Sequence, residues 1–229
     1  MMRRGSRTPA DDRGRRRRPH PMAAPAVVAL FAAAACGAPG DRGGDGAMVP
    51  DTFGVVFETS EGPFEVEFIR AWSPSAVDRV WELGQSGFWA GARIYRVNDR
   101  YAQFGYSGVP EADARWIPAG LPDEPVRASN VRGTVSFARG GPGTRSAILF
   151  VNREDNTNLD ALEWNGVLGF PPVGRVVRGM EVIDALHDGY GDAPLQWEDS
   201  IATLGNAFLD RVYPELDTIA EVRVVAGGG

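Results

Sequence analysis

Residues 55–68, VVFETSEGPFEVEF, narrow the choice of fold more than any other stretch of the chain. Apolar and polar side chains alternate on both sides of Ser60, Glu61 and Gly62, and a period of two is that of a strand with one buried face. Two such runs around a short polar segment with glycine predict a β-hairpin. The folded part is therefore expected to open with two antiparallel strands whose apolar faces need a further layer.

Two helices and several short strands are expected after the hairpin. The segment SPSAVDRVWELGQSG offers Ser73 or Ser75 as N-cap and Pro74 near the first turn, with apolar residues at helical spacing. The segment GMEVIDALHDG, residues 179–189, is the second expected helix and stops near Gly189. Many short strands with few helices predict a mainly-β protein, a closed or nearly closed barrel with helical caps. The expected strands are residues 94–97, 101–104, 134–138, 148–152, 173–177 and 219–225.

Residues 1–35 are expected to be a signal peptide. The arginine-rich stretch RGRRRRPHPM precedes AAPAVVALFAAAAC, a short apolar run that ends in small residues at Cys36, the only cysteine. This order is that of a secretory signal, and the run is too short to cross a bilayer. The alanines before Cys36 are similar to a bacterial lipobox, whose cysteine carries lipid; a plain signal peptide with an incidental cysteine is the alternative. Residues 36–51 are expected to form a flexible tether, and residues 52–229 the folded domain.

The expected location follows from this leader, and the charge excludes one class of partner. We expect export to the periplasm or cell surface, with the chain held on the membrane as a lipoprotein through Cys36. After residue 35 the chain has 16 basic and 28 acidic residues, a net charge of −12. Because binding of phosphate groups needs a basic face, nucleic acid is not an expected partner.

Most familiar catalytic chemistry is excluded by composition. His187 is the only histidine after the leader, so a Ser-His-Asp triad, a cysteine nucleophile and a histidine-based zinc site are not expected. The segment GGPGT, residues 140–144, lacks the lysine of a phosphate loop and is read as a tight turn. Residues 152–160 have oxygen ligands without the spacing of a calcium loop. No cofactor or metal is therefore predicted.

Arg96 stands in the middle of the apolar run Ile94–Val97. A half-buried guanidinium is costly unless something pairs with it. One interpretation is an ion pair with a nearby carboxylate, with the side-chain stem packed on aromatic rings. The other is an arginine that faces a ligand, and the residues alone leave both open.

Five segments, in order, resemble the cyclophilin-type peptidyl-prolyl isomerases of the exported bacterial type. The resemblance runs from about Val55 to Val225 and implies a closed eight-stranded antiparallel β-barrel capped by two α-helices. It implies cis-trans isomerisation of X–Pro bonds by a monomer that binds proline-containing segments of envelope or exported client proteins. The segments are FETSEGPFEVEF, SPSAVDRVWELGQSGFWAGARIYRV, RGTVSFARGGPGTRSAILFVN, LGFPPVGRVVRGMEVIDAL and GNAFLDRVYPELDTIAEVRVV.

The resemblance also implies roles for individual residues. Arg96 takes the catalytic position, and Gln103 matches the glutamine that orients the substrate backbone. Phe150 matches the floor of the proline pocket and Leu159 its wall. The other substrate-binding positions are Ala138 and Arg139, on the strand whose backbone pairs with the peptide, Phe170, where many eukaryotic members have histidine, and Tyr101.

Two departures from the family pattern keep a second function open. The loop between Arg96 and Gln103 is one residue shorter than in the commoner forms, so either Tyr101 or Arg100 supplies the next pocket wall. Ile148 replaces a glutamine that hydrogen-bonds the peptide. These features favour a peptide-binding or chaperone module with little turnover as the alternative to an active isomerase. A barrel that carries an unrelated ligand is the third hypothesis.

Overall fold

The structure is a computed structural model that describes residues 48–226. The predicted signal peptide, Cys36 and most of the predicted tether lie outside the described residues. Within residues 48–226, no helix is long and apolar enough to span a membrane.

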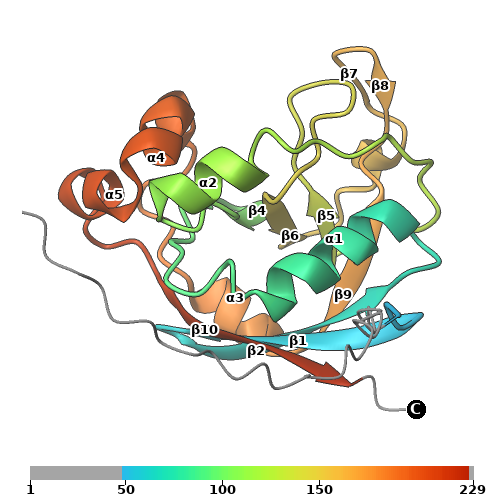
Figure 1. Cartoon of the computed structure of the whole chain (residues 1–229), viewed down its shortest axis with the longest axis horizontal. Helices are drawn as coiled ribbons and strands as arrows, with labels where there is room; N and C mark the ends of the chain where they lie inside the picture. The colour runs from blue at the N-terminus through green and yellow to red at the C-terminus, as the bar shows by residue number, and fades with distance from the viewer. Residues whose placement is uncertain (1–47, 227–229) are drawn as a thin grey trace, which may run out of the picture. The chain divides into compact units, whose positions relative to one another are not determined.

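The expected hairpin is confirmed and lies next to the edge strand of an eight-stranded antiparallel sheet (Figure 1). Strands β1 (Thr52–Thr59) and β2 (Gly62–Ile69) pair along their whole length, and β1 also pairs with β10 (Ile219–Ala226). The alternation read from the sequence buries Phe57, Phe64 and Phe68 on the inner face. The full order is β10, β1, β2, β9 (Pro172–Arg178), β5 (Thr134–Phe137), β6 (Leu149–Asn152), β4 (Tyr101–Phe104) and β3 (Arg96–Val97).

The sheet curls into a half-barrel, and the closed barrel expected from the sequence is not what the strand order shows. Closure would require the end strands β3 and β10 to pair along their length. Of the expected strand 94–97, only Arg96 and Val97 form β3, which is too short for this. The two edges are linked beside β3 by one bridge, between Arg93 and Thr218, where Ile94 N donates to the carbonyl oxygen of Asp217 at 2.9 Å.

Both expected helices are present, with different lengths. Helix α1 (Pro74–Gln85) follows Ser73 as predicted, but the Ser73 side chain does not cap it. Glu124 does so from outside, because its carboxylate accepts hydrogen bonds from the Ser73 hydroxyl and from Ser75 N, the latter at 2.9 Å. Helix α3 (Met180–Ala185) ends earlier than expected, since His187 N donates at 2.7 Å to the carboxylate of Asp217 instead of to a helical carbonyl.

The expectation of two helices was wrong, because residues 48–226 contain five α-helices. The additional ones are α2 (Pro110–Trp116), α4 (Glu198–Leu204) and α5 (Asn206–Val212), together with the hairpin of β7 (Glu163–Trp164) and β8 (Val167–Leu168). Each extra helix has seven residues, about two turns, which is too few for a helical period of apolar residues to be recognised in the sequence. Helices α4 and α5 and the β7–β8 hairpin lie at opposite ends of the molecule (Figure 1).

Two apolar clusters hold these parts together. The main core fills the inner face of the sheet with aromatic rings, and Trp89 joins it to the loop before β6 through a 3.1 Å hydrogen bond from its indole N–H to the carbonyl oxygen of Ala147. A second cluster lies against α4 and α5 and includes Tyr95, Tyr106 and Phe208.

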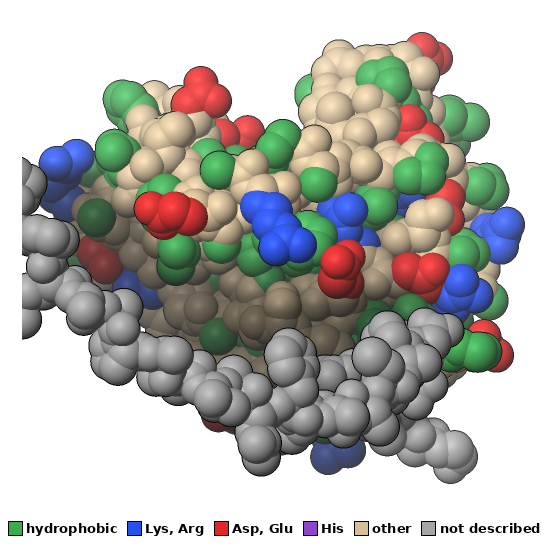
Figure 2. Space-filling view, viewed as in Figure 1, with side chains coloured by type: hydrophobic (Ala, Val, Ile, Leu, Met, Phe, Trp, Pro, Cys, Tyr) green, Lys and Arg blue, Asp and Glu red, His purple; other side chains and the backbone are tan. Residues whose placement is uncertain are grey.

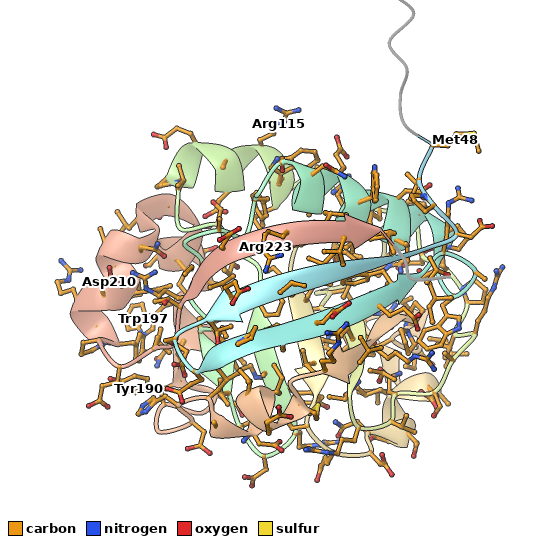
Figure 3. All side chains as sticks on the ribbon, turned by 90° about the horizontal axis from the view of Figure 1, so that it is seen from below. Met48, Arg115, Tyr190, Trp197, Asp210 and Arg223 are labelled. Atoms are coloured by element: carbon orange, nitrogen blue, oxygen red, sulfur yellow. The ribbon has the colours of Figure 1, made fainter. Side chains whose placement is uncertain are left out.

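The outer face of β10, β1 and β2 is charged (Figure 3). Arg223, labelled in that view, donates at 2.7 Å to Glu58 on the neighbouring strand. Arg175 on β9 donates likewise to Glu67 on β2 at 3.0 Å. Such exposed cross-strand pairs suit a face turned to solvent.

Candidate active site

The strand register places the key predicted side chains in one row. Arg96 on β3 lies opposite Gln103 on β4, Gln103 lies opposite Phe150 on β6, and Phe150 lies opposite Ser136 on β5. Residues directly opposite each other in a sheet share a face. Their neighbours Ala102 and Val151 point the other way, into the main core. A row of functional groups therefore stands on the face turned away from the core.

This row lies in a pocket of about 660 Å³. Figure 2 shows the molecule hollowed between the part that carries α4 and α5 and the part that carries the β7–β8 hairpin. The structure brings all eight expected residues of the folded domain to this pocket, while their roles stay predictions. They are Arg96, Tyr101, Gln103, Ala138, Arg139, Phe150, Leu159 and Phe170.

The apolar part of the pocket is a group of aromatic rings. The Phe150 ring lies between Tyr101, with ring centroids 5.3 Å apart, and Phe170, at 6.3 Å, both edge-on. Tyr101 is thus the side chain that the short loop supplies. Arg100 does not line the pocket: it donates at 2.7 Å to the side-chain oxygen of Asn156, and its guanidinium carbon lies 5.4 Å from the centre of the Tyr101 ring.

Arg96 pairs with a carboxylate and also lines the pocket. The ion-pair interpretation is thus confirmed, while its facing a ligand stays a prediction. Its Nε donates to Asp192 Oδ1 at 2.6 Å and its Nη1 to Gln103 Oε1 at 2.9 Å. The guanidinium also lies 4.9 Å from the centre of the Tyr101 ring, a cation–π contact. Partial burial alone would raise the pKa of Asp192, but the hydrogen bond and charge of Arg96 and the amide of Asn98 lower it below its ordinary value.

Gln103 is held from its other side by Tyr95. The Gln103 Nε2 donates to the Tyr95 hydroxyl at 2.6 Å, and that hydroxyl donates to Glu198 Oε1 at 3.5 Å. Tyr95 is fully buried, and burial is the main reason why its pKa lies well above that of an ordinary tyrosine. The hydroxyl therefore keeps its proton, and the Gln103 amide oxygen is fixed toward Arg96.

Replacing Tyr95 with phenylalanine should lower kcat/KM by about three- to tenfold, because it leaves the buried Gln103 amide without its acceptor. The measurement is X–Pro isomerisation at limiting substrate, with the free energy of unfolding alongside. Tyr190→Phe is the control, since its hydroxyl accepts only a 3.4 Å bond from the exposed Glu215 N. An unchanged kcat/KM in Tyr95→Phe would show that Gln103 needs no such support.

The Arg139 side chain is buried behind the Phe170 wall, while the predicted pairing of its backbone with a peptide stays a prediction. Its side chain is 1% exposed and lies near Asp123, with a closest N–O distance of 3.7 Å. The guanidinium carbon stands 4.5 Å from the centre of the Phe170 ring, and Nη2 donates to the carbonyl oxygen of Val167 at 3.0 Å. Arg139 thus supports the Phe170 wall from behind.

The chain between β5 and β6 contains the turn expected at residues 140–144 and, at Ile148, the replacement of the expected glutamine. Residues 140–144 form a tight turn, in which Gly140 N and Gly141 N donate to the Thr144 hydroxyl at 2.9 and 3.0 Å. Ile148 lines the pocket, and its carbonyl oxygen accepts from Ala138 N at 2.9 Å. The position of the family's glutamine therefore gives the pocket an apolar side chain.

In the described part of the chain, no three or more His, Cys, Asp or Glu residues are grouped to hold a metal ion.

Three functional candidates were missed from sequence. Asp192, which fixes Arg96, is 96 residues away along the chain. Glu198 and Trp164 line the pocket from segments to which the sequence assigned no role. No local pattern could have found them, because only the folded chain brings Asp192 beside β3.

The sequence model of the family described as cyclophilin type peptidyl-prolyl cis-trans isomerase/CLD matches residues 54–206, more than half of the chain. The chain belongs to this family. It is a cyclophilin-type peptidyl-prolyl cis-trans isomerase, EC 5.2.1.8, which confirms the activity expected from the resemblance.

Known cyclophilin-type enzymes resemble this chain over most of their own length. The peptidyl-prolyl cis-trans isomerase cyp18 of Streptomyces antibioticus is 28% identical over 153 residues, 62% of this chain and 92% of that protein. Peptidyl-prolyl cis-trans isomerase A of Dickeya dadantii is 30% identical over 138 residues, 58% of this chain and 70% of that protein. A crystal structure of a cyclophilin-type isomerase from Cryptosporidium parvum shares the fold, with a TM-score of 0.51 at 15% identity, over 77% of this chain and 99% of that one.

Proposed function

We propose that this cyclophilin isomerises X–Pro bonds in segments of envelope or exported proteins, with Arg96 as the catalytic residue. The observation that carries the proposal is the position of Arg96, one strand away from Gln103 and two from the aromatic floor at Phe150. A proline ring on that floor would bring its amide nitrogen toward the guanidinium.

The chemistry needs a hydrogen-bond donor and no nucleophile. Rotation about the peptide bond has a barrier of roughly 18–20 kcal/mol, because the amide nitrogen shares its lone pair with the carbonyl. At the twisted transition state the lone pair is localised on the proline nitrogen and can accept a hydrogen bond. A donor aimed there stabilises the transition state more than the ground state.

Arg96 is prepared for this task by its partners. Asp192 and Gln103 occupy its Nε and Nη1, and among the described residues Nη2 makes no hydrogen bond within the protein. The donor is thus already oriented when substrate arrives, and little reorganisation is needed. Ala138 and Arg139 would pair with the peptide backbone, while Leu159, Tyr101 and Phe170 would enclose the proline ring.

A second candidate is a peptide-binding module with slow turnover, which Ile148 favours because the pocket lacks a polar group there. Exchange NMR on a short X–Pro peptide separates the two. We expect a substoichiometric amount of protein to broaden the cis and trans proline signals. Chemical-shift changes of the protein on peptide binding, without any acceleration of exchange, would favour the binding module, and neither effect would refute both.

Export and anchoring are the second part of the proposal, supported by the leader sequence through Cys36. In cells given a labelled fatty acid, the wild-type chain should incorporate label and fractionate with membranes. Cys36→Ala should lose the label, because it removes the only thiol that could carry a lipid. Equal label in both forms would rule out lipidation of Cys36, whereas an exported, unlabelled wild type would fit a plain signal peptide.

A further inference from the structure

Glu198 is the unpaired charge of the pocket. Three of its lining residues are charged at neutral pH: Arg96, Arg139 and Glu198. Both arginines have carboxylate partners, Asp192 at 2.6 Å and Asp123 at 3.7 Å. Within residues 48–226 no cationic nitrogen lies within 4 Å of Glu198, whose carboxylate accepts only the 3.5 Å bond from Tyr95. The paired charges cancel, which leaves one negative charge at Glu198.

Glu198 stands at the end of the pocket away from the aromatic floor. It is the first residue of α4 and directly follows the 3₁₀-helix η2 (Ala193–Trp197). The chain just before η2 is tied to β3 by a bridge between Val97 and Gly191. Phe150 lies opposite Gln103, Gln103 donates to the Tyr95 hydroxyl, and that hydroxyl donates to Glu198. Glu198 is therefore separated from the proline floor by Gln103 and Tyr95.

The surroundings of Glu198 suit the side chain of a bound lysine or arginine. Tyr106, Ile117 and Leu195 line the same end of the pocket and would pack on the methylene stem of such a residue. Glu198 is an exposed residue, but partial burial of its carboxyl raises the pKa above its ordinary value. A cationic side chain beside this carboxylate would offset that cost.

We propose that Glu198 selects client segments that carry lysine or arginine close to the isomerised proline. This inference rests on the isomerase function proposed above, and it assigns Glu198 to specificity and not to chemistry. The body's net charge of −12 after residue 35 acts in the same direction, because it attracts cationic segments over longer distances.

The test uses X–Pro peptides in which lysine, alanine or glutamate occupies, in turn, each of the two positions on either side of the X–Pro pair. At one position or more, kcat/KM of the wild type should fall in the order lysine, alanine, glutamate, with about fivefold between the extremes. Glu198→Gln should abolish the difference and Glu198→Arg should invert it. The preference should also shrink in 1 M salt, since exposed charges are then screened.

Asp199→Asn is the matched control. It removes the same charge from the next residue of α4, which does not line the pocket, and should keep the wild-type preference. Equal kcat/KM for all peptides, or a lysine preference that survives in Glu198→Gln, would overturn the inference while leaving the isomerase function intact. Failure of the wild type to accelerate any peptide would instead overturn the proposed function and the inference with it.

Discussion

Arg96→Ala should lower kcat/KM for X–Pro isomerisation by about 100- to 1000-fold, the usual loss when a preorganised transition-state donor is removed. The guanidinium of Arg96 is held in place by hydrogen bonds to Asp192 and Gln103. We therefore expect no neighbouring side chain to take over its role. Arg96→Lys should recover little of the rate, because the N–H groups of an ammonium diverge from one nitrogen and cannot reproduce the planar fork that reaches Asp192 and Gln103 and still faces the pocket. The measurement is exchange NMR or a protease-coupled assay at limiting peptide.

Arg93→Ala is the control for a general effect of losing an arginine. Arg93 makes an equivalent pair, with its Nε 2.8 Å from Asp210 Oδ1, and its side-chain exposure of 18% is close to the 20% of Arg96. It does not line the pocket, so its loss should leave kcat/KM within about twofold. If Arg96→Ala, folded as the wild type, isomerised as fast as the wild type, Arg96 would not be the catalytic residue.

The sequence could predict the row of site residues because strand periodicity fixes which side chains share a face. Once β4 is placed at residues 101–104, Gln103 must point away from the core side of Ala102. The choice of these residues as a site was supplied by the family resemblance and not by the pattern. Together they were enough to gather eight residues in one pocket.

The rest depended on contacts between distant segments. The barrel stays open because β3 has only two residues, Arg96 and Val97, and the segment before it meets β10 only at its first residues, which no alternation reveals. The α1 cap came from Glu124, 51 residues after Ser73, and not from Ser73 alone. The acidic residues Asp192 and Glu198 reach the pocket through short helices without a readable period.

Glu124→Ala should destabilise the domain by about 3 kcal/mol, the usual cost of stranding one member of a buried ion pair. The Arg145 side chain is 1% exposed, and its Nη2 donates to Glu124 Oε2 at 3.0 Å. The same carboxylate caps α1 through Ser75 N. For a domain of this size the melting temperature should fall by roughly 6–12 °C. Thermal and urea unfolding measure the loss, and Glu82→Ala, which removes an exposed partner 3.8 Å from Arg79, should change stability by less than about 0.5 kcal/mol.

The pH dependence of Glu124→Ala separates loss of the charge from loss of packing. Burial alone would raise the pKa of Glu124, but hydrogen bonds from Ser73, Ser75 and Arg145, with the charge of Arg145, lower it below its ordinary value. A carboxylate with a lowered pKa stabilises the fold above its unfolded-state pKa of about 4.3, and this contribution is lost as the pH falls through the folded-state value. The unfolding free energies of wild type and Glu124→Ala should therefore differ most near pH 7 and converge in acid. A constant gap from pH 7 to pH 2 would mean that Glu124 acts through its volume and not through its charge.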